Sequence, residues 1–310
     1  MKTAFVFPGQ GAQYIGMGMD FLQNDAYSFD ALENFDLLHH TNLREVMQEG
    51  PEESLKQTNY TQPAILLHSV AALRRFLTHS KVRADYVAGH SLGEFTAMVA
   101  AGMLDLPAAM HLVHKRGEFM IKANAGVPFA MAAIIGLSPE KVTELCEEAS
   151  SAGMVQAVNF NTPIQTVISG TADGVQAAGE LAKSHGAKRV LPLVVGGPFH
   201  TPLISQASFW LQAEMESISF RDADIPVVSN LDSLPTISGT LEKEKLVKQI
   251  ISPVRWVECI QYMIGQGVNR FIEFGPQKAL CGMIKNINKD VEVFSIDKIE
   301  DVDAVVSATS

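Results

Sequence analysis

The stretch that decides the fold reads Tyr86-Val87-Ala88-Gly89-His90-Ser91-Leu92-Gly93-Glu94, within which residues 89–93 fit the pattern G-x-S-x-G. It predicts an apolar strand over 86–88, a sharp turn at Ser91 and a helix over 94–101. Such a turn pushes the serine hydroxyl outward, and its glycines let another segment pass close behind it. The new helix also points free backbone N–H groups toward whatever the serine attacks. The alternative is a plain strand-to-helix turn, because the five-residue pattern alone is common.

Strands alternate with helices on both sides of this turn. The chain opens with an expected strand, Thr3–Phe7, and helical patterns follow near 55–78 and from Pro107 onward. This alternation predicts an α/β fold with a mostly parallel sheet that helices cover on both faces. We expect the tail beyond Asp301 to be frayed. Further helices and strands are expected at 203–217, 225–229, 241–251 and 270–273.

In the middle third of the chain, the predicted strands and helices follow a different order. The order is β-α-β-β-α-β, which is the ferredoxin-like arrangement. We therefore expect a large α/β domain formed by residues 1–126 and 195–310, with residues 127–194 inserted as a small subdomain. Ser138 is the expected N-cap of the first of its helices. The predicted elements are strand 129–135, helix 139–149, strands 155–160 and 165–169 joined by a turn at 161–163, helix 173–186 and strand 188–193.

Composition and charge exclude several classes of function. The chain has 310 residues, of which 47% are hydrophobic, so a sizeable packed core is available. Its formal charge of −10, without a basic stripe, argues against nucleic-acid binding. No apolar run approaches the roughly 18–20 residues of a membrane span. Cys146, Cys259 and Cys281 are too few and too scattered for a disulfide framework or a zinc site, and they fit a cytoplasmic protein.

A serine nucleophile needs a base, and nine histidines are available. His111 and His114 stand one helical turn apart, which permits metal binding, but no third ligand is evident and we expect no metal site. His200 differs because it follows a glycine-rich loop after a strand and precedes a helix. Loops at strand ends are where open α/β sheets keep their sites. From the residues alone, His200 is the best of several candidates.

The glycine-rich turn Pro8–Gly11 is a second candidate site. It lacks the G-x-G-x-x-G spacing of a dinucleotide-binding loop, because Tyr14 stands where the third glycine belongs. Its backbone N–H near Gln10 could instead pair with the N–H that follows Ser91. Two such donors make an oxyanion hole. An ordinary tight turn is an equally good interpretation of the spacing.

Arg116 lies on a helix whose buried side is marked by Leu112, Val113 and Met120. An arginine beside such an apolar stripe should have an anionic partner, because burying an unpaired charge is very costly. Its guanidinium suits a carboxylate, which it can bind through two parallel hydrogen bonds. The alternative is a salt bridge or a surface arginine.

Together these stretches resemble malonyl-CoA:acyl carrier protein transacylases. Any single match is weak, but the set occurs in family order over nearly the whole chain. The resemblance implies an α/β-hydrolase-like large domain with a ferredoxin-like insertion, in agreement with the division above. The matching segments are Phe5–Gly11, Gly89–Glu94, Lys115–Gly117, Asn159–Asn161, Val167–Gly170, Gly197–Pro202, Ser252–Trp256 and Glu273–Pro276.

The resemblance also implies catalytic roles. Ser91 would be the nucleophile and His200 the general base. The backbone N–H groups of Gln10 and Leu92 would form the oxyanion hole. Gln249 matches a family glutamine that helps to orient the histidine, which a backbone carbonyl holds there in place of an aspartate.

The same resemblance implies the substrate and the partners. Arg116 would bind the free carboxylate of a malonyl group, and Met120 and Phe199 would line the pocket. The implied reaction transfers malonyl from malonyl-CoA to the phosphopantetheine thiol of acyl carrier protein, for fatty-acid or polyketide synthesis. It needs no cofactor. We expect a cytoplasmic monomer that binds neither nucleic acid nor membranes.

Two other functions remain open from the sequence. The first is an ester or acyl-carrier-protein hydrolase that uses the same serine, although it would have no use for Arg116. The second is a non-catalytic module that binds acyl carrier protein and is indifferent to Ser91.

Overall fold

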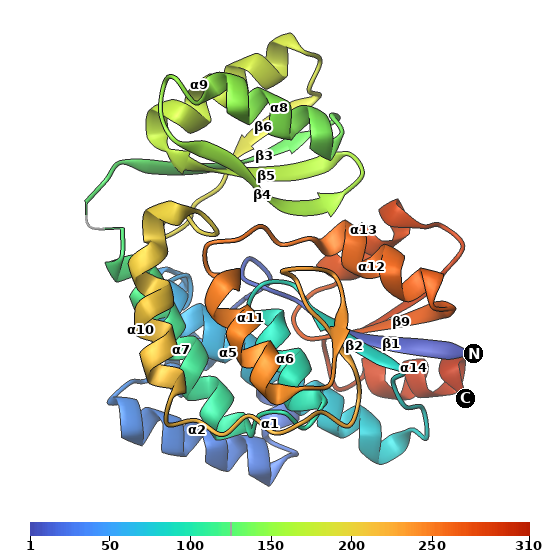
Figure 1. Ribbon diagram of the computed structural model, residues 1–310. Coiled ribbons are helices and arrows are strands. Elements are labelled where there is room, and N and C mark those ends of the chain that lie inside the picture. The colour runs from blue at the N-terminus through green and yellow to red at the C-terminus, as the bar shows by residue number, and fades with distance from the viewer. Residues whose placement is uncertain (125) are drawn as a thin grey trace.

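The computed structural model describes residues 1–124 and 126–310 and places them in two parts (Figure 1). Within these residues, a six-stranded, mostly parallel sheet forms the larger part and a four-stranded antiparallel sheet forms the smaller one. The α/β class predicted from the sequence is therefore confirmed. Residue 125, in the predicted join between the two domains, lies outside the described residues.

The larger sheet has the strand order β10-β9-β1-β2-β7-β8. Its strands pair in parallel except for β8, which runs antiparallel to β7. The register sets Phe7 opposite Gly89, so the loops that follow β1 and β2 leave the sheet side by side. These strands are β1 (Lys2–Phe7), β2 (Tyr86–Gly89), β7 (Val227–Val228), β8 (Pro235–Thr236), β9 (Val268–Phe274) and β10 (Glu292–Ile296).

Helices cover both faces of this sheet because side chains alternate along its strands. Phe5 and Phe7 belong to the main core, whereas Ala4 and Val6 belong to a second core on the opposite face. The second core is closed by α12 (Trp256–Gly265) and α13 (Ala279–Ile287). The helices that contribute to the main core are α1 (Met19–Leu22), α2 (Ala26–His39), α3 (Leu43–Glu49), α4 (Glu52–Leu55), α5 (Thr58–His79), α6 (Gly93–Ala100), α7 (Leu106–Lys122), α10 (Ser205–Met215), α11 (Gly239–Gln249) and α14 (Asp301–Thr309).

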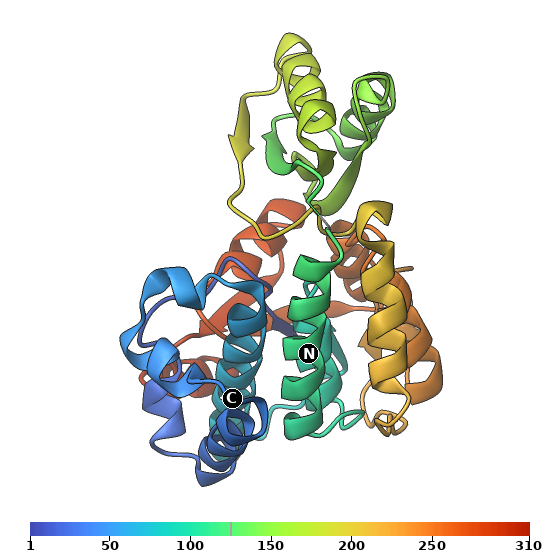
Figure 2. The same cartoon turned by 90° about the vertical axis from the view of Figure 1, so that its left-hand side faces the viewer.

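The smaller part has the strand order β4-β5-β3-β6 and a hydrophobic core of its own. Two helices cover the outer face of its sheet, and the other face turns toward the larger part (Figures 1 and 2). Ser138 caps the first of these helices by accepting a hydrogen bond from the backbone of Lys141, as predicted. The elements are β3 (Phe129–Ile135), α8 (Pro139–Ala149), β4 (Val155–Thr162), β5 (Gln165–Thr171), α9 (Ala172–Ser184) and β6 (Arg189–Pro192).

Strand β4 joins the two parts through its backbone. The N–H of Val254 donates to the carbonyl of Val158 at 2.7 Å, and the N–H of Phe160 donates to the carbonyl of Val254 at 3.0 Å. These bonds set β4 directly beside the segment that follows α11. The smaller sheet is therefore held against the larger part close to the carboxyl ends of β1 and β2.

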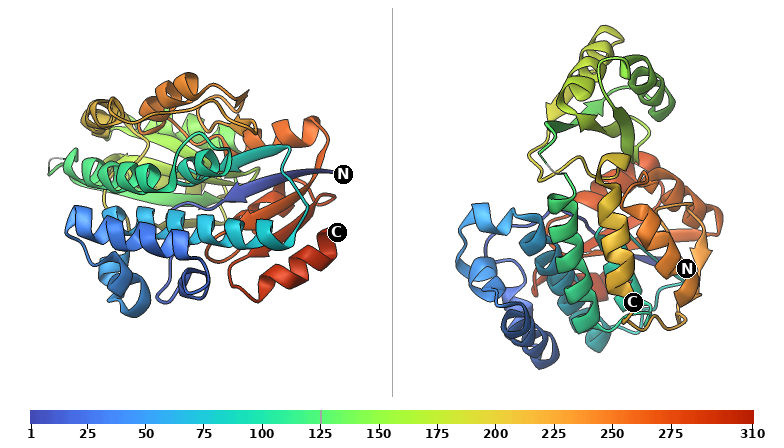
Figure 3. Two further views of the ribbon diagram at one scale, coloured as in Figure 1. Left: turned by 90° about the horizontal axis from the view of Figure 1, so that it is seen from below. Right: turned by 60° about the vertical axis from the view of Figure 1, so that its left-hand side comes forward.

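Two predictions about local structure were wrong. The turn expected at 161–163 lies at 163–164, because β4 continues through Asn161 and Thr162 and Thr162 pairs with Gln165. The tail expected to fray forms α14, whose Val302 and Val305 are buried in the main core. Figure 3 shows both chain ends on the same side of the molecule. The sequence analysis also predicted none of the four helices between residues 19 and 55.

Within the described residues, none of the helices combines the length and the apolar character that crossing a bilayer requires.

The turn at Ser91 depends on glycines at close backbone contacts. A Cβ atom on Gly89 would lie 1.8 Å from the carbonyl carbon of Gly93, and one on Gly93 would lie 2.1 Å from the carbonyl oxygen of Phe7. Real side chains do not approach backbone so closely. The predicted close passage of another segment behind the serine is thus confirmed, and that segment is the end of β1.

We predict that Gly89→Ala and Gly93→Ala each destabilise the protein by more than the ~1–3 kcal/mol of ordinary overpacking. The reason is that the clashing atoms are backbone and cannot move aside. Equilibrium unfolding in urea measures the change.

The matched control is Gly282→Ala in α13. A Cβ at Gly282 would meet nothing within 4 Å among the described residues, and alanine is the better helix former by about 1 kcal/mol. This variant should be as stable as the parent or more so. Equal stability for all three variants would contradict the interpretation of the turn.

Candidate active site

Ser91 sits at the tip of the turn between β2 and α6 with its hydroxyl facing a histidine. Its backbone φ is +52°, a left-handed conformation that non-glycine residues seldom adopt. Its Oγ lies 2.8 Å from Nε2 of His200. The structure therefore brings together the serine and the histidine that the sequence singled out, although 109 residues separate them.

His200 is held in one orientation by a backbone carbonyl. Its Nδ1 lies 2.9 Å from the carbonyl oxygen of Gln249, so Nδ1 carries the proton and donates it. The lone pair of Nε2 then faces Ser91. Burial, followed by the nearby positive charge of Arg116, lowers the pKa of His200 to about 3. The imidazole is therefore neutral at ordinary pH, which is the state that can accept a proton.

The turn after β1 lies against the serine turn. A Cβ on Gly9 would come within 2.5 Å of the carbonyl oxygen of His90, which shows how close the two loops are. Within the described residues, the backbone N–H groups of Gln10 and Leu92 donate to no other residue. Both residues line the cavity around Ser91. The two free donors are available to an oxyanion that forms beside the serine.

Arg116 is almost fully buried, and no carboxylate among the described residues bonds to it directly. Its Nη1 donates to Oε1 of Gln62 at 2.9 Å, and its Nη2 donates to Oε1 of Gln249 at 3.0 Å and to Oγ of Ser91 at 3.1 Å. Burial lowers the pKa of Arg116 to about 10, which still leaves it charged at neutral pH. A buried cation beside the nucleophile, bonded only to neutral groups, is ready for an anionic ligand.

These side chains enclose a small cavity of about 110 Å³. Met120 and Phe199, which the resemblance placed in the pocket, are buried and line it. The volume suits a short acyl group and is well below that of a site for a whole drug-sized ligand. The cavity is lined by Gln10, Gln62, His90, Ser91, Leu92, Arg116, Met120, Met131, Asn159, Val167, Leu193, Val195, Phe199 and His200.

Three polar residues of the site were missed from the sequence. Asn230 accepts the N–H of Ser91 at 2.7 Å and donates to the carbonyl of Gly89 at 2.7 Å, so it braces the turn from behind. Gln62 binds Arg116, and Asn161 binds the ring of His90 at 2.8 Å. A polar residue inside an apolar helical pattern, as at Gln62, is the one signal that could have been used.

The remaining histidine pair lies away from the cavity. His111 contacts His39 at 3.2 Å and Glu214 at 2.6 Å, while Nδ1 of His114 lies 2.9 Å from the carbonyl oxygen of Asn59. Across the described part of the chain, no three such side chains are arranged to hold a metal ion.

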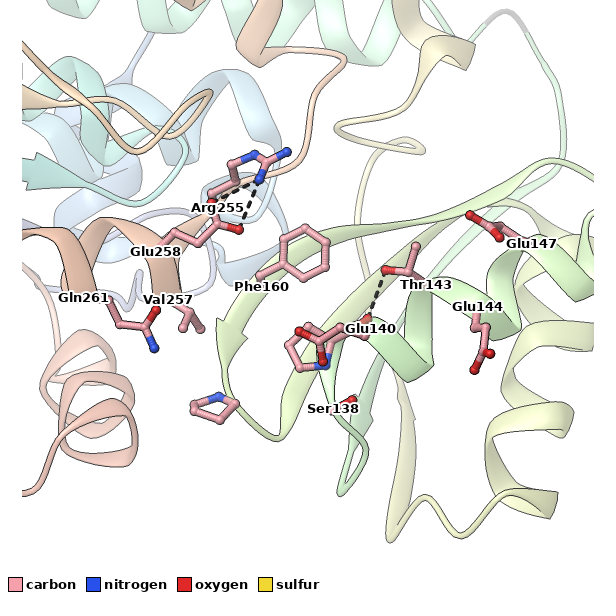
Figure 4. A pocket seen from close by; sticks show the side chains of 12 residues that line it. Ser138, Glu140, Thr143, Glu144, Glu147, Phe160, Arg255, Val257, Glu258 and Gln261 are labelled. Atoms are coloured by element: carbon pink, nitrogen blue, oxygen red, sulfur yellow. Dashed lines mark hydrogen bonds and ion pairs between the residues drawn. The ribbon is translucent and has the colours of Figure 1, made fainter.

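A larger cavity, of about 680 Å³, lies between α8 and α12 (Figure 4). Its rim is acidic, with Glu140, Glu144 and Glu147 on α8, and Arg255 pairs with Glu258 across from them. Among the described residues that line it, there is no histidine or cysteine. The chemistry of the site is therefore carried by the smaller cavity at Ser91.

Comparison with known proteins agrees with this geometry. The acyl transferase domain family matches residues 4–301. A malonyl CoA-acyl carrier protein transacylase of Bacillus subtilis is 41% identical over 306 residues, which cover 98% of this chain and 96% of that protein. The crystal structure of an acyl carrier protein S-malonyltransferase from Vibrio cholerae is 40% identical and superposes with a TM-score of 0.93, covering 98% of this chain and 100% of that one.

A third relative is a malonyl-transacylase in complex with a type II PKS acyl-carrier protein in its holo form. It is 36% identical, has a TM-score of 0.95 and covers the whole of both chains. Identity at this level over nearly the full length establishes more than a shared fold. The chain is a member of the malonyl-CoA:acyl carrier protein transacylase family.

Proposed function

We propose that this chain transfers a malonyl group from malonyl-CoA to the phosphopantetheine thiol of acyl carrier protein through an ester on Ser91. The observation that carries the proposal is the buried guanidinium of Arg116, which lies 3.1 Å from the nucleophile and has no bonded carboxylate among the described residues. Malonyl brings a free carboxylate to this cation while presenting its thioester to Ser91. The names of the relatives support the same donor and acceptor.

The geometry supports a two-stage reaction. His200 Nε2 takes the hydroxyl proton as Ser91 Oγ attacks the thioester carbonyl, and the N–H groups of Gln10 and Leu92 stabilise the oxyanion. The C–S bond then breaks, and His200 returns the proton to the departing thiolate of CoA. The acceptor thiol attacks the Ser91 ester by the same steps in reverse. Each stage leaves His200 neutral, and the second stage restores the free hydroxyl of Ser91.

The relatives carry transacylase names and give no support to the hydrolase or to the non-catalytic module. A serine bonded to a neutral, correctly oriented histidine also favours an enzyme over a binding module.

The finer description of the fold is also part of the proposal. We assign residues 1–126 and 195–310 to an α/β-hydrolase-like domain and residues 127–194 to a ferredoxin-like insertion. The order of strands and helices in the smaller part and its separate core support this division.

We further propose a cytoplasmic monomer that needs no cofactor beyond its two substrates. The cysteines of the described chain are free and buried, which supports a reducing compartment. Each chemical step above uses only groups of the protein and of the substrates.

The first prediction about the proposed reaction concerns the nucleophile. Brief mixing with malonyl-CoA should add one malonyl group to the wild-type protein and none to Ser91→Ala, because the ester has no other attachment point. Intact-protein mass spectrometry measures the adduct, and holo acyl carrier protein should discharge it. Release of free CoA without any adduct or acceptor would support the hydrolase instead.

The second prediction concerns the carboxylate. Arg116→Ala should lower the rate of malonyl loading by about tenfold to a hundredfold, the effect of losing hydrogen bonds to a charged group. Acetyl loading should fall much less, because acetyl has no carboxylate. Lys115→Ala is the matched control, since this neighbouring cation pairs with Glu118 on the surface. An unchanged malonyl-to-acetyl ratio in Arg116→Ala would remove the proposed role.

The third prediction concerns pH. Because burial lowers the pKa of His200 from 6.5 to about 3, the base stays unprotonated as the pH falls. The rate of acetyl loading should therefore hold level from about pH 8 down to about pH 5, where an ordinary histidine would already be inactive.

Arg116→Ala tests the cause of this shift. Removing the cation removes one of the two main influences that lower the pKa of His200, so the acid limb should move to higher pH. Acid also weakens the fold, because below about pH 6.5 the histidines of the unfolded chain take up protons that the buried His200 does not. Thermal melting at each pH therefore shows whether a loss of rate is inactivation or unfolding. A wild-type acid limb centred near pH 6.5 would refute the prediction.

A further inference from the structure

The side-chain amide of Gln249 lies between a buried cation and a buried anion. Its Oε1 accepts from Nη2 of Arg116 at 3.0 Å. Its Nε2 donates to Oε2 of Glu94 at 2.7 Å and to the carbonyl oxygen of Ser91 at 3.0 Å. If the amide were turned over, its NH₂ would face the N–H of Arg116 and its oxygen would face the carboxylate of Glu94. Only the first orientation of the amide forms all of these hydrogen bonds, and the charges of Arg116 and Glu94 at its two ends favour that orientation.

Glu94 follows the serine turn in sequence but does not enter the cavity. Its carboxylate is fully buried and accepts three hydrogen bonds, from Oγ of Ser229 at 2.9 Å, from the backbone N–H of Asn230 at 3.1 Å and from Gln249. Hydrogen bonds donated to a carboxylate offset the cost of burying it. Glu94 is thus a fixed anion placed behind the site, one amide away from Arg116.

A second buried carboxyl, that of Glu242, adjoins Glu94. Within the described residues, no N–H group donates to its side-chain oxygens, which lie against the carboxylate of Glu94, and the nearby Lys245 binds Asp232 instead. Burial, followed by the negative charge of Glu94, raises the pKa of Glu242 well above its usual range. The two adjacent carboxyls therefore differ, because Glu94 accepts three hydrogen bonds and no N–H group in the described chain donates to Glu242.

We propose that Glu94 is a positioning residue for malonyl selectivity, which acts through the Gln249 side chain to hold Arg116 in its carboxylate-binding orientation. The inference rests on the proposed function, since it explains how that function selects its acyl group. Arg116 has neutral partners at Nη1 and Nη2 and an unpartnered Nε in the described chain. Without the anion behind Gln249, the amide can turn over and the guanidinium loses its fixed acceptor. His200 keeps its own support, because it bonds to the main chain of Gln249.

The test compares two adjacent carboxyls with the same substitution. In Glu94→Gln, malonyl loading of Ser91 should slow by about tenfold to a hundredfold with a raised KM for malonyl-CoA, while acetyl loading changes little. In Glu242→Gln, both rates should stay within about twofold of wild type, because among the described residues this side chain bonds to neither Gln249 nor Arg116. Mass spectrometry of the loaded protein gives both rates, and thermal melting shows that each variant is folded.

Several outcomes would overturn the proposal. A folded Glu94→Gln with the wild-type malonyl-to-acetyl ratio would do so, as would equal losses in Glu94→Gln and Glu242→Gln. Faster malonyl loading in Glu94→Gln would also do so, since it would mean that Glu94 acts mainly by repelling the substrate carboxylate.

Gln249→Met decides the question if Glu94→Gln does not fold. It keeps the backbone carbonyl for His200 but removes both ends of the amide, so malonyl loading should fall more than acetyl loading and the malonyl-to-acetyl ratio should drop. An unchanged preference would overturn the proposal. The wild-type protein separates this inference from the proposed function: if wild type takes up no malonyl at all, the proposed function fails, whatever the variants do.

Discussion

The approach of two backbones at Phe7 and Gly93 is the constraint on which the rest of the site depends. The carbonyl of Phe7 lies where a side chain on Gly93 would have to be, and the same carbonyl accepts the N–H of His90 at 3.0 Å. The serine turn is therefore seated directly on the end of β1. This contact brings the loop of Gln10 beside Leu92, fixes the start of α6, and sets the strained backbone of Ser91 so that its hydroxyl points into the cavity toward His200.

A buried charge is the second organising feature. Arg116 sits in the protein interior among amides and a hydroxyl, with the nearest fixed anion held one residue away. A directly bonded carboxylate would stabilise the empty site more, but it would compete with a substrate carboxylate for the same N–H groups. The arrangement keeps the cation solvated by protein dipoles and leaves room for its ligand. The same cation helps to keep His200 neutral, so selectivity and base strength are set by one side chain.

The parts of the fold and of the site that depend on neighbouring residues could be predicted from the sequence. The strand, turn and helix around Ser91 lie within fifteen residues, and the cap at Ser138 and the strand 129–135 are likewise encoded by their neighbours in the chain. Asn230 carries no such local signal, because the atoms that it binds in the serine turn lie about 140 residues away in sequence. Asn161 and Thr162 look like turn residues, yet pairing with β5 and contact with His90 override that preference. The C-terminal helix was missed because its two buried valines find their partners only in the folded core.

Strand β4 has a consequence for how such proteins can be recombined. Its Asn161 bonds to the residue before the nucleophile, and its Gln156 donates to the carbonyl of His200 at 2.8 Å. The smaller part therefore contributes to the active site directly, because its side chains support both the turn of Ser91 and the loop of His200. A chimera that exchanges this part between homologues to alter substrate range has to carry over the two amides, or the serine and the histidine lose their common support.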